Sequence, residues 1–241
     1  MARLVLWDVD HTLIENAGVS KEIYGAAFAA LTGRQPSHLA PTEGRTDPDI
    51  MEAMFRLHDA APVAWSTVKV ALERAGEEHH SALAERGTVL PGVSALVAAL
   101  AARDDVVQTV VTGNIRANAE VKLSALGLAE ALDLDVGGYG SDSRLRPRLV
   151  EVARRRAAAK YGSDFGDAAN AIVIGDTPRD VEAAAHGGAR VLAVASGVHD
   201  VDELRAAGAG YVVPSLADTD AIVTFVVSPL TTDSRARPGT L

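Results

Sequence analysis

The sequence of 241 residues contains no cysteine and few aromatic residues, which make up 4% of the chain. Without cysteine there can be no disulfide framework, no thiolate zinc site and no cysteine nucleophile. The chain also lacks an apolar run long enough to span a bilayer, and its first residues show neither the basic region nor the cleavage site of a secretory signal. We therefore expect a soluble, cytoplasmic protein with no membrane partner.

Basic residues are also in short supply, because 23 lysines and arginines face 32 aspartates and glutamates and leave a formal net charge of −9. This charge argues against a nucleic-acid partner held through its phosphates and against an anionic membrane surface. An anionic ligand would need local positive charge at its site. The hydrophobic content of 48% is sufficient for one substantial core and a smaller accessory unit. The sequence does not distinguish a monomer from a dimer.

Strand-like and helical patterns alternate along most of the chain. Helical patterns cover residues 93–102, 116–126, 148–160 and 178–186, and they separate apolar runs at 3–7, 106–111, 132–136, 171–175 and 190–194. This alternation predicts an α/β fold with a doubly wound, mostly parallel sheet that helices cover on both faces.

Residues 14–90 interrupt the alternation and show no strand signal. Apolar residues follow helical spacing from Ser20 to Gly33 and again after Pro48. We predict that 14–90 forms an all-helical domain mounted on the sheet, and that residues 1–13 and 91–227 together form the α/β core domain. The final stretch, 228–241, has no periodicity and is expected to be a disordered tail.

The first apolar run ends in Asp8 and Asp10. Side chains two residues apart on an extended segment point to the same side, so the two carboxylates can converge at the end of the strand. Converging carboxylates repel each other unless a cation or a shared proton lies between them. The alternative is a strand followed by an ordinary acidic turn.

Two further predicted strands also end in polar residues. Thr112-Gly113-Asn114 follows the second run, and Gly175-Asp176 opens a segment that reaches Asp180 after the fourth. Ligands of open parallel sheets bind beyond the carboxyl ends of the strands, where these groups would meet. Crowded carboxylates suit a hard cation such as Mg²⁺, whereas a hydroxyl, an amide and helix N-terminal N–H groups suit a phosphate.

The motifs Asp-x-Asp-x-Thr, Thr-Gly-Asn, a basic residue before a helix, and Gly-Asp-Thr-x-x-Asp occur in this order. Together they resemble the haloacid dehalogenase-like hydrolase superfamily, and more narrowly its phosphoglycolate phosphatase-like branch. The resemblance covers residues 3 to about 225. It implies a Rossmann-like core, a helical cap at 14–90, and a phosphatase that acts on a small phosphorylated metabolite, such as a phosphoglycolate-like compound or a sugar phosphate.

The resemblance also assigns catalytic roles. Asp8 matches the nucleophile that forms an aspartyl-phosphate, and Asp10 matches the general acid and base. Thr112 matches the hydroxyl that binds the phosphate, helped by the backbone of Gly113 and Asn114.

A metal site follows from the same resemblance. Asp8, the carbonyl of Asp10 and Asp176 would hold Mg²⁺, and Asp180 matches the acid that supports the water shell of the metal. Such a cation offsets the charge of a carboxylate that attacks an anion.

The third motif departs from the common pattern of the family, which usually has a lysine there. Arg144, Arg146 and Arg148 compete for its role in this chain. Pro147 fits the first turn of the following helix, which places Arg146 where its guanidinium can turn toward the strand ends. We therefore expect Arg146 to neutralise the phosphate, with Arg148 as the second choice.

The predicted cap should decide the substrate. Its segment 44–47 resembles one that approaches the active site in this branch, and Arg45 is a candidate contact to an anionic group remote from the phosphate. The alternative is a solvated turn at the entrance of a helix.

Other functions share parts of these motifs. A phosphomutase shares every motif and differs mainly in its cap, whereas a dehalogenase would not need Asp10, because halide leaves without a proton. A non-catalytic protein that binds metal or phosphate, or a phospho-acceptor regulatory protein, is the alternative from another class.

Overall fold

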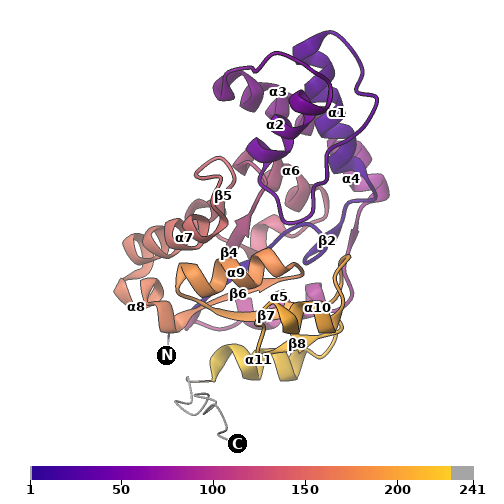
Figure 1. The fold of residues 1–241 in the computed structure, drawn as a ribbon. Coiled ribbons are helices and arrows are strands. Elements are labelled where there is room, and N and C mark those ends of the chain that lie inside the picture. Colours follow the sequence, from indigo (N-terminus) through magenta and orange to yellow (C-terminus); the bar gives the residue numbers. More distant parts are fainter. Residues whose placement is uncertain (1, 229–241) are drawn as a thin grey trace, which may run out of the picture.

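The computed structural model describes residues 2–228, and within them a six-stranded parallel sheet forms the centre of the larger domain (Figure 1). The strand order is β5-β4-β1-β6-β7-β8, and every neighbouring pair is parallel. The strands are β1 (Arg3–Trp7), β4 (Val106–Thr112), β5 (Gly138–Tyr139), β6 (Ala171–Gly175), β7 (Arg190–Val194) and β8 (Val212–Val213).

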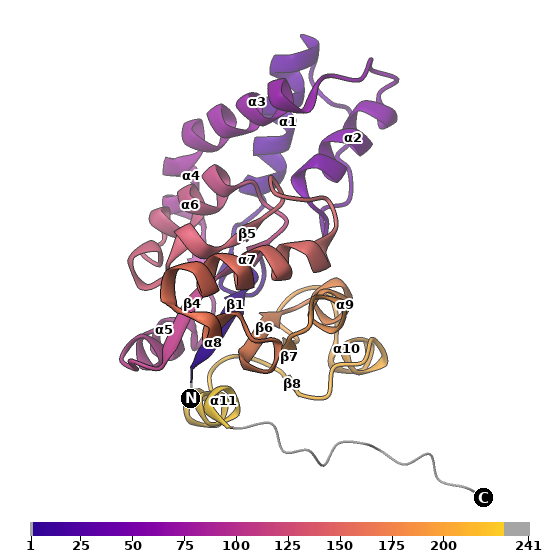
Figure 2. The ribbon, with the colours of Figure 1, turned by 90° about the vertical axis from the view of Figure 1, so that its left-hand side faces the viewer.

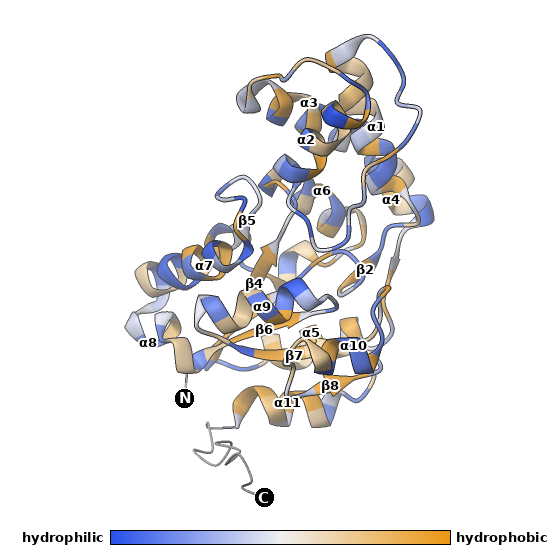
Figure 3. Ribbon diagram, in the orientation of Figure 1, coloured by the Kyte–Doolittle hydropathy of each residue, from blue (hydrophilic) through white to orange (hydrophobic). Residues whose placement is uncertain are grey.

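Helices cover both faces of the sheet, as the alternating pattern predicted (Figure 2). Along β1, Val5 and Trp7 point into one hydrophobic cluster, which includes residues of α5 (Val93–Ala101) and α11 (Thr219–Val227). Leu4 and Leu6 point into a second cluster against α7 (Arg146–Tyr161) and α9 (Pro178–Gly187). Successive side chains of β1 therefore point to opposite faces of the sheet, and both faces are buried. Figure 3 shows the hydrophobic strands β6 and β7, with hydrophilic residues frequent on α7 and α9.

The strands predicted at 3–7, 171–175 and 190–194 are confirmed with the same bounds, and β4 extends the run 106–111 by Thr112. The strand predicted at 132–136 is wrong. A short 3₁₀ helix, η2 (Leu134–Val136), stands there, and β5 begins only at Gly138. The side chain of Asp133 accepts a hydrogen bond from the N–H of Asp135 and caps η2, so a local aspartate turn replaces the extended backbone.

Four helices form the cap above the sheet: α1 (Val19–Thr32), α2 (Asp47–Leu57), α3 (Trp65–Glu78) and α4 (His80–Arg86) (Figure 1). They enclose a separate hydrophobic cluster around Phe28 and Met54. Contrary to our expectation of no strand in 14–90, β2 (Ile14–Glu15) pairs antiparallel with β3 (Thr88–Val89). Each has two residues, too few for a periodic pattern, and pairing arises because the chain leaves and re-enters the core at one place.

The helix α6 (Arg116–Ala125) lies at the boundary between the two domains, because it contacts α3 and α4 of the cap. None of the helices in residues 2–228 has the length and the apolar character needed to cross a membrane. The tail predicted at 228–241 lies, apart from Ser228, outside the described residues. The remaining elements are α8 (Ser163–Gly166), α10 (Val201–Ala206), η1 (Ala129–Ala131) and η3 (Ala168–Asn170).

Candidate active site

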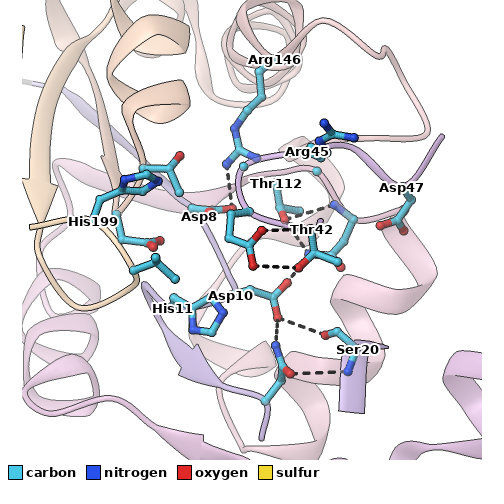
Figure 4. Close-up of a pocket in the computed structure, with 18 of the residues that line it drawn as sticks. Asp8, Asp10, His11, Ser20, Thr42, Arg45, Asp47, Thr112, Arg146 and His199 are labelled. Atoms are coloured by element: carbon cyan, nitrogen blue, oxygen red, sulfur yellow. Dashed lines mark hydrogen bonds and ion pairs between the residues drawn. The ribbon is translucent and has the colours of Figure 1, made fainter. Parts of the chain in front are cut away.

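Asp8 follows β1 directly and lies at the carboxyl end of the sheet. Its N–H donates to the carbonyl of Ile174 at 2.8 Å, which continues the pairing of β1 with β6. The side chain is 8% exposed, and one carboxylate oxygen lies 3.0 Å from Nη2 of Arg146 (Figure 4). One of the two central strands of the sheet therefore fixes the position of Asp8 through its backbone.

Asp8, Asp176 and Asp180 form a compact acid cluster. Each offers a carboxylate oxygen, and these oxygens lie within 4.8 Å of one another. Burial raises the pKa of Asp8 and of Asp176 above the ordinary range, and the Asp8 carboxylate raises that of Asp176 further. Three buried acids with too little positive charge are a donor set that fits a hard divalent cation. The side chain of Asp10 does not belong to this cluster.

The outer members of the acid cluster are held by neighbouring residues. Thr12 donates its hydroxyl hydrogen to Asp176 at 2.7 Å. Asp180 accepts from the N–H and the hydroxyl of Thr177, in a capping box at the start of α9. The Gly-Asp-Thr-x-x-Asp motif is thus both a helix cap and the support of two cluster acids.

Arg146 is the first residue of α7, and its side chain is almost fully buried. Its Nη2 forms ion pairs with Asp8 and Asp180, and its buried Nε has no hydrogen-bond partner among the described residues. An unsatisfied buried N–H of a cation next to the nucleophile suits an oxygen of a bound anion.

The other two candidate arginines lie outside the site. The guanidinium of Arg148 is exposed and pairs with Glu151 at 2.7 Å. Arg144 is also exposed and reaches across to acids on α2 of the cap, Asp49 and Glu52. Of the three arginines that the sequence left in competition, only Arg146 contacts the acid cluster.

Asp10 lies in the same cavity but is held by a different set of partners (Figure 4). Nζ of Lys122 approaches both of its carboxylate oxygens, at 2.8 and 2.6 Å. The side-chain amides of Asn114 and Asn16 donate to it at 2.8 and 2.7 Å. Burial alone would raise the pKa of Asp10, but Lys122 and these amides outweigh it and lower the pKa to about 2.

Thr112 ends β4, and Gly113 and Asn114 follow it; we call these three residues the β4 loop. All three line the cavity. The hydroxyl oxygen of Thr112 accepts from the side-chain amide of Asn114 at 2.8 Å, and that amide also binds Asp10. The Asn114 side chain is therefore turned toward Asp10 and Thr112. The N–H of Asn114 donates to the Thr112 hydroxyl at 3.3 Å, and the carbonyls of Asn114 and Gly113 accept from the N–H groups of Gly140 and Asp47, both at 2.8 Å.

The cap touches the β4 loop through the segment 44–47. A Cβ on Gly113 would lie 2.0 Å from the carbonyl oxygen of Arg45, so only glycine permits this approach. Arg45 is half-buried and lines the cavity, and its side chain forms no hydrogen bond or ion pair within residues 2–228. A cation without a protein partner at the wall of the cavity is available to a ligand.

Asp47, at the start of α2, joins the cap to the core. Its N–H donates to the carbonyl of Gly113, and its carboxylate accepts from the N–H of Ile115, both at 2.8 Å. The Tyr24 hydroxyl binds the second carboxylate oxygen at 2.7 Å. Burial raises the pKa of Asp47 to about 6, although the hydrogen bonds from Ile115 and Tyr24 act to lower it. The cap is thus closed over the carboxyl end of the sheet.

The enclosed cavity has a volume of about 50 Å³, and core and cap both line it. A single ordered water needs roughly 10–15 Å³ on this measure. The closed cavity therefore suits a small polar group. His11 and His199 stand at its edge (Figure 4), which adds polar contacts from two further loops.

Sequence reasoning missed Lys122 and Asp47 as parts of this site. Both are almost fully buried, at 1% exposure each. A local signal exists for Lys122, because it shares a helical face with the buried residues Ile115, Asn118 and Ala119. A lysine within an otherwise buried helical stripe needs an acidic partner, and Asp10 is that partner.

Comparison with known proteins identifies the family of this chain. Residues 5–185 match the profile of the haloacid dehalogenase-like hydrolase family, which is well over half of the chain. This chain belongs to the haloacid dehalogenase-like hydrolases. The family resemblance and the fold predicted from the sequence are thereby confirmed.

Relatives of this haloacid dehalogenase-like hydrolase include a probable phosphatase, IndB of Dickeya dadantii, which is 26% identical over 222 residues and covers 90% of this chain and 92% of its own. Among solved structures, CbbY from Rhodobacter sphaeroides in complex with phosphate is 22% identical, with a TM-score of 0.67 and coverage of 90% and 96%. A putative β-phosphoglucomutase from Thermotoga maritima is 18% identical, with a TM-score of 0.60 and coverage of 93% and 98%.

Proposed function

We propose that this hydrolase is a Mg²⁺-dependent phosphatase that cleaves a small phosphate ester through an aspartyl-phosphate on Asp8. The observation that carries the proposal is the separation of two carboxylates in one cavity. Asp8 belongs to the acid cluster and pairs with Arg146, whereas Asp10 is held apart by Lys122 and two amides. Two carboxylates in different environments can divide the roles of nucleophile and acid or base.

The reaction then has two steps. In the first, a carboxylate oxygen of Asp8 attacks phosphorus and the bond from phosphorus to the ester oxygen breaks. Asp10, whose protonated form the negative charge of the bound phosphate would favour, gives its proton to that leaving oxygen. In the second, Asp10 takes a proton from water as the water oxygen attacks phosphorus, and the bond to Asp8 breaks. Inorganic phosphate is released and both aspartates return to their starting states.

The remaining site residues bind the phosphoryl group. The Thr112 hydroxyl, the backbone of Gly113 and Asn114, and the unsatisfied Nε of Arg146 would contact its oxygens. Such fixed donors stabilise the charge that develops as the bonds change. The closed cap excludes water while the aspartyl-phosphate forms.

Asp8, the backbone carbonyl of Asp10 and Asp176 would hold Mg²⁺, with Asp180 supporting its water ligands. When bound, the cation would offset the charge between the carboxylate of Asp8 and the phosphate. The fit rests on the acid cluster, whose three carboxylates face one buried arginine.

Removal of divalent cations should abolish the hydrolysis of phosphate esters. Excess chelator should stop inorganic phosphate release from a panel of phosphorylated metabolites, and Mg²⁺ should restore it. Ca²⁺ should inhibit, because its larger and looser coordination disturbs the alignment of the attacking oxygen. Full activity in chelator would contradict the metal site. A product in which the phosphoryl group has moved within the substrate, instead of free phosphate, would indicate a phosphomutase.

Arg45 should contribute to substrate choice. We expect Arg45→Ala to raise KM for substrates with a second anionic group by roughly tenfold or more, because a charge-assisted hydrogen bond is lost. The turnover of p-nitrophenyl phosphate, which has no such group, should fall much less. Steady-state kinetics over the panel measures both, with Arg56→Ala on the exposed side of α2 as the matched control. An unchanged ranking of substrates would refute the role of Arg45.

A further inference from the structure

Lys122 is the most deeply buried lysine of the described chain, with a side chain 2% exposed. It lies near the end of α6, and its ammonium group uses all of its donors. Two go to the carboxylate oxygens of Asp10, at 2.8 and 2.6 Å, and one goes to the side-chain oxygen of Asn114, at 2.7 Å. The partner is thus an aspartate 112 positions earlier in the sequence.

Lys122 does not line the cavity, whereas Asp10 and Asn114 do. It therefore cannot contact a substrate in this closed form and can act only through these two residues. Stability alone explains it poorly, because a buried ion pair gains little over apolar side chains of the same size once desolvation is counted.

The two carboxylates of the proposed mechanism thus have separate buried cations. Arg146 pairs with Asp8 and approaches from α7, while Lys122 pairs with Asp10 and approaches from α6. On the cap side, Asn16 donates to the same oxygen of Asp10 as Lys122 does. Asn16 belongs to the linker that enters the cap, whereas Lys122 belongs to the core. The contacts that Lys122 and Asn114 make with Asp10 are therefore independent of the linker.

We propose that Lys122 is a positioning residue, which fixes the carboxylate of Asp10 at the wall of the cavity so that it meets the leaving oxygen. This inference rests on the proposed phosphatase function. The precision matters because a displacement of about 1 Å of a reacting group can cost on the order of 10²-fold in rate.

The test compares two kinds of ester. A p-nitrophenolate leaves without a proton, but an alkoxide does not, so misplacement of Asp10 should slow alkyl esters most. In single-turnover release of the leaving group, we expect Lys122→Met to slow the best alkyl phosphate by on the order of 10–10²-fold. Its effect on p-nitrophenyl phosphate should be several times smaller, and KM should change little. Lys69→Met, which alters a half-exposed lysine on α3, is the matched control.

A double-mutant cycle shows whether Lys122 acts through Asp10. In an Asp10→Asn background, Lys122→Met should have almost no further effect on alkyl ester cleavage. The same fold loss in both backgrounds would overturn the proposal, and so would an equal loss for alkyl and aryl esters. If circular dichroism shows that Lys122→Met does not fold, Lys122→Gln replaces it in the same measurements. That variant keeps an N–H donor but removes the charge.

The outcomes separate this inference from the proposed function. If Asp10→Asn slows alkyl esters while Lys122→Met and Lys122→Gln match the wild type, the role of Lys122 is wrong and the phosphatase proposal stands. If Asp8→Asn retains full activity, the proposed function is wrong, whatever the lysine variants do.

Discussion

Asp8→Asn should abolish hydrolysis and phosphoenzyme formation together. An amide cannot attack phosphorus, and loss of a covalent nucleophile in other enzymes costs on the order of 10⁶-fold in turnover. The substitution keeps the size of the side chain and an oxygen that can accept from Arg146. The fold should therefore persist. Acid quenching after mixing with a ³²P-labelled substrate measures the phosphoenzyme, and phosphate release measures turnover.

Asp10→Asn is the matched comparison, because it changes the second carboxylate of the same motif. It should still form the phosphoenzyme, and turnover should fall by on the order of 10²–10⁴-fold, the usual cost of a lost acid or base. The carbonyl of Asp10 remains, so Mg²⁺ activation should be little altered. Labelled phosphoenzyme in Asp8→Asn together with its absence from Asp10→Asn would reverse the two roles.

Arg146→Ala should depress turnover of every substrate alike. Its guanidinium contacts Asp8, the proposed nucleophile, and Asp180. Removal of one preorganised donor to a transition state costs on the order of 10²–10³-fold in other enzymes. The ranking of substrates in the panel should therefore be preserved while kcat/KM falls uniformly, which distinguishes this arginine from Arg45.

Arg148→Ala provides the control for Arg146, since both residues lie in the first turn of α7 and only one faces the cavity. It should leave kinetics within about twofold of the wild type, because exposed ion pairs contribute little. Thermal unfolding of both variants should be compared, since Arg146 also neutralises Asp180. If Arg148→Ala is the more damaging change, the assignment is wrong.

The sequence was sufficient to predict most of the polar residues that lie at the ends of the strands. Asp8, Thr112 and Asp176 each follow a β-strand or end one, and the alternation of the chain places those strand ends at one edge. The preference for Arg146 came from Pro147, because proline in the first turn marks where a helix begins. These signals depend only on neighbouring residues, so they can be recognised in the sequence without knowledge of the fold.

The parts that could not be predicted depend on contacts between distant segments. Lys122 meets Asp10 only because α6 packs between the sheet and the cap, and Asp47 binds the backbone of Ile115, which has no sequence signature. The error at 132–136 has a different cause. An apolar run containing two aspartates can form a capped turn as readily as a strand.

The contact of Asp47 with the core has a consequence for product release in the proposed reaction. Asp47 binds the carbonyl of Gly113 and the N–H of Ile115, the main-chain groups on either side of Asn114. In the proposed phosphatase, opening of the cap would break both bonds and loosen the loop that would hold the phosphate, so cap opening and phosphate release would be coupled. An aspartate of the cap, outside the proposed chemistry, would then control when phosphate leaves.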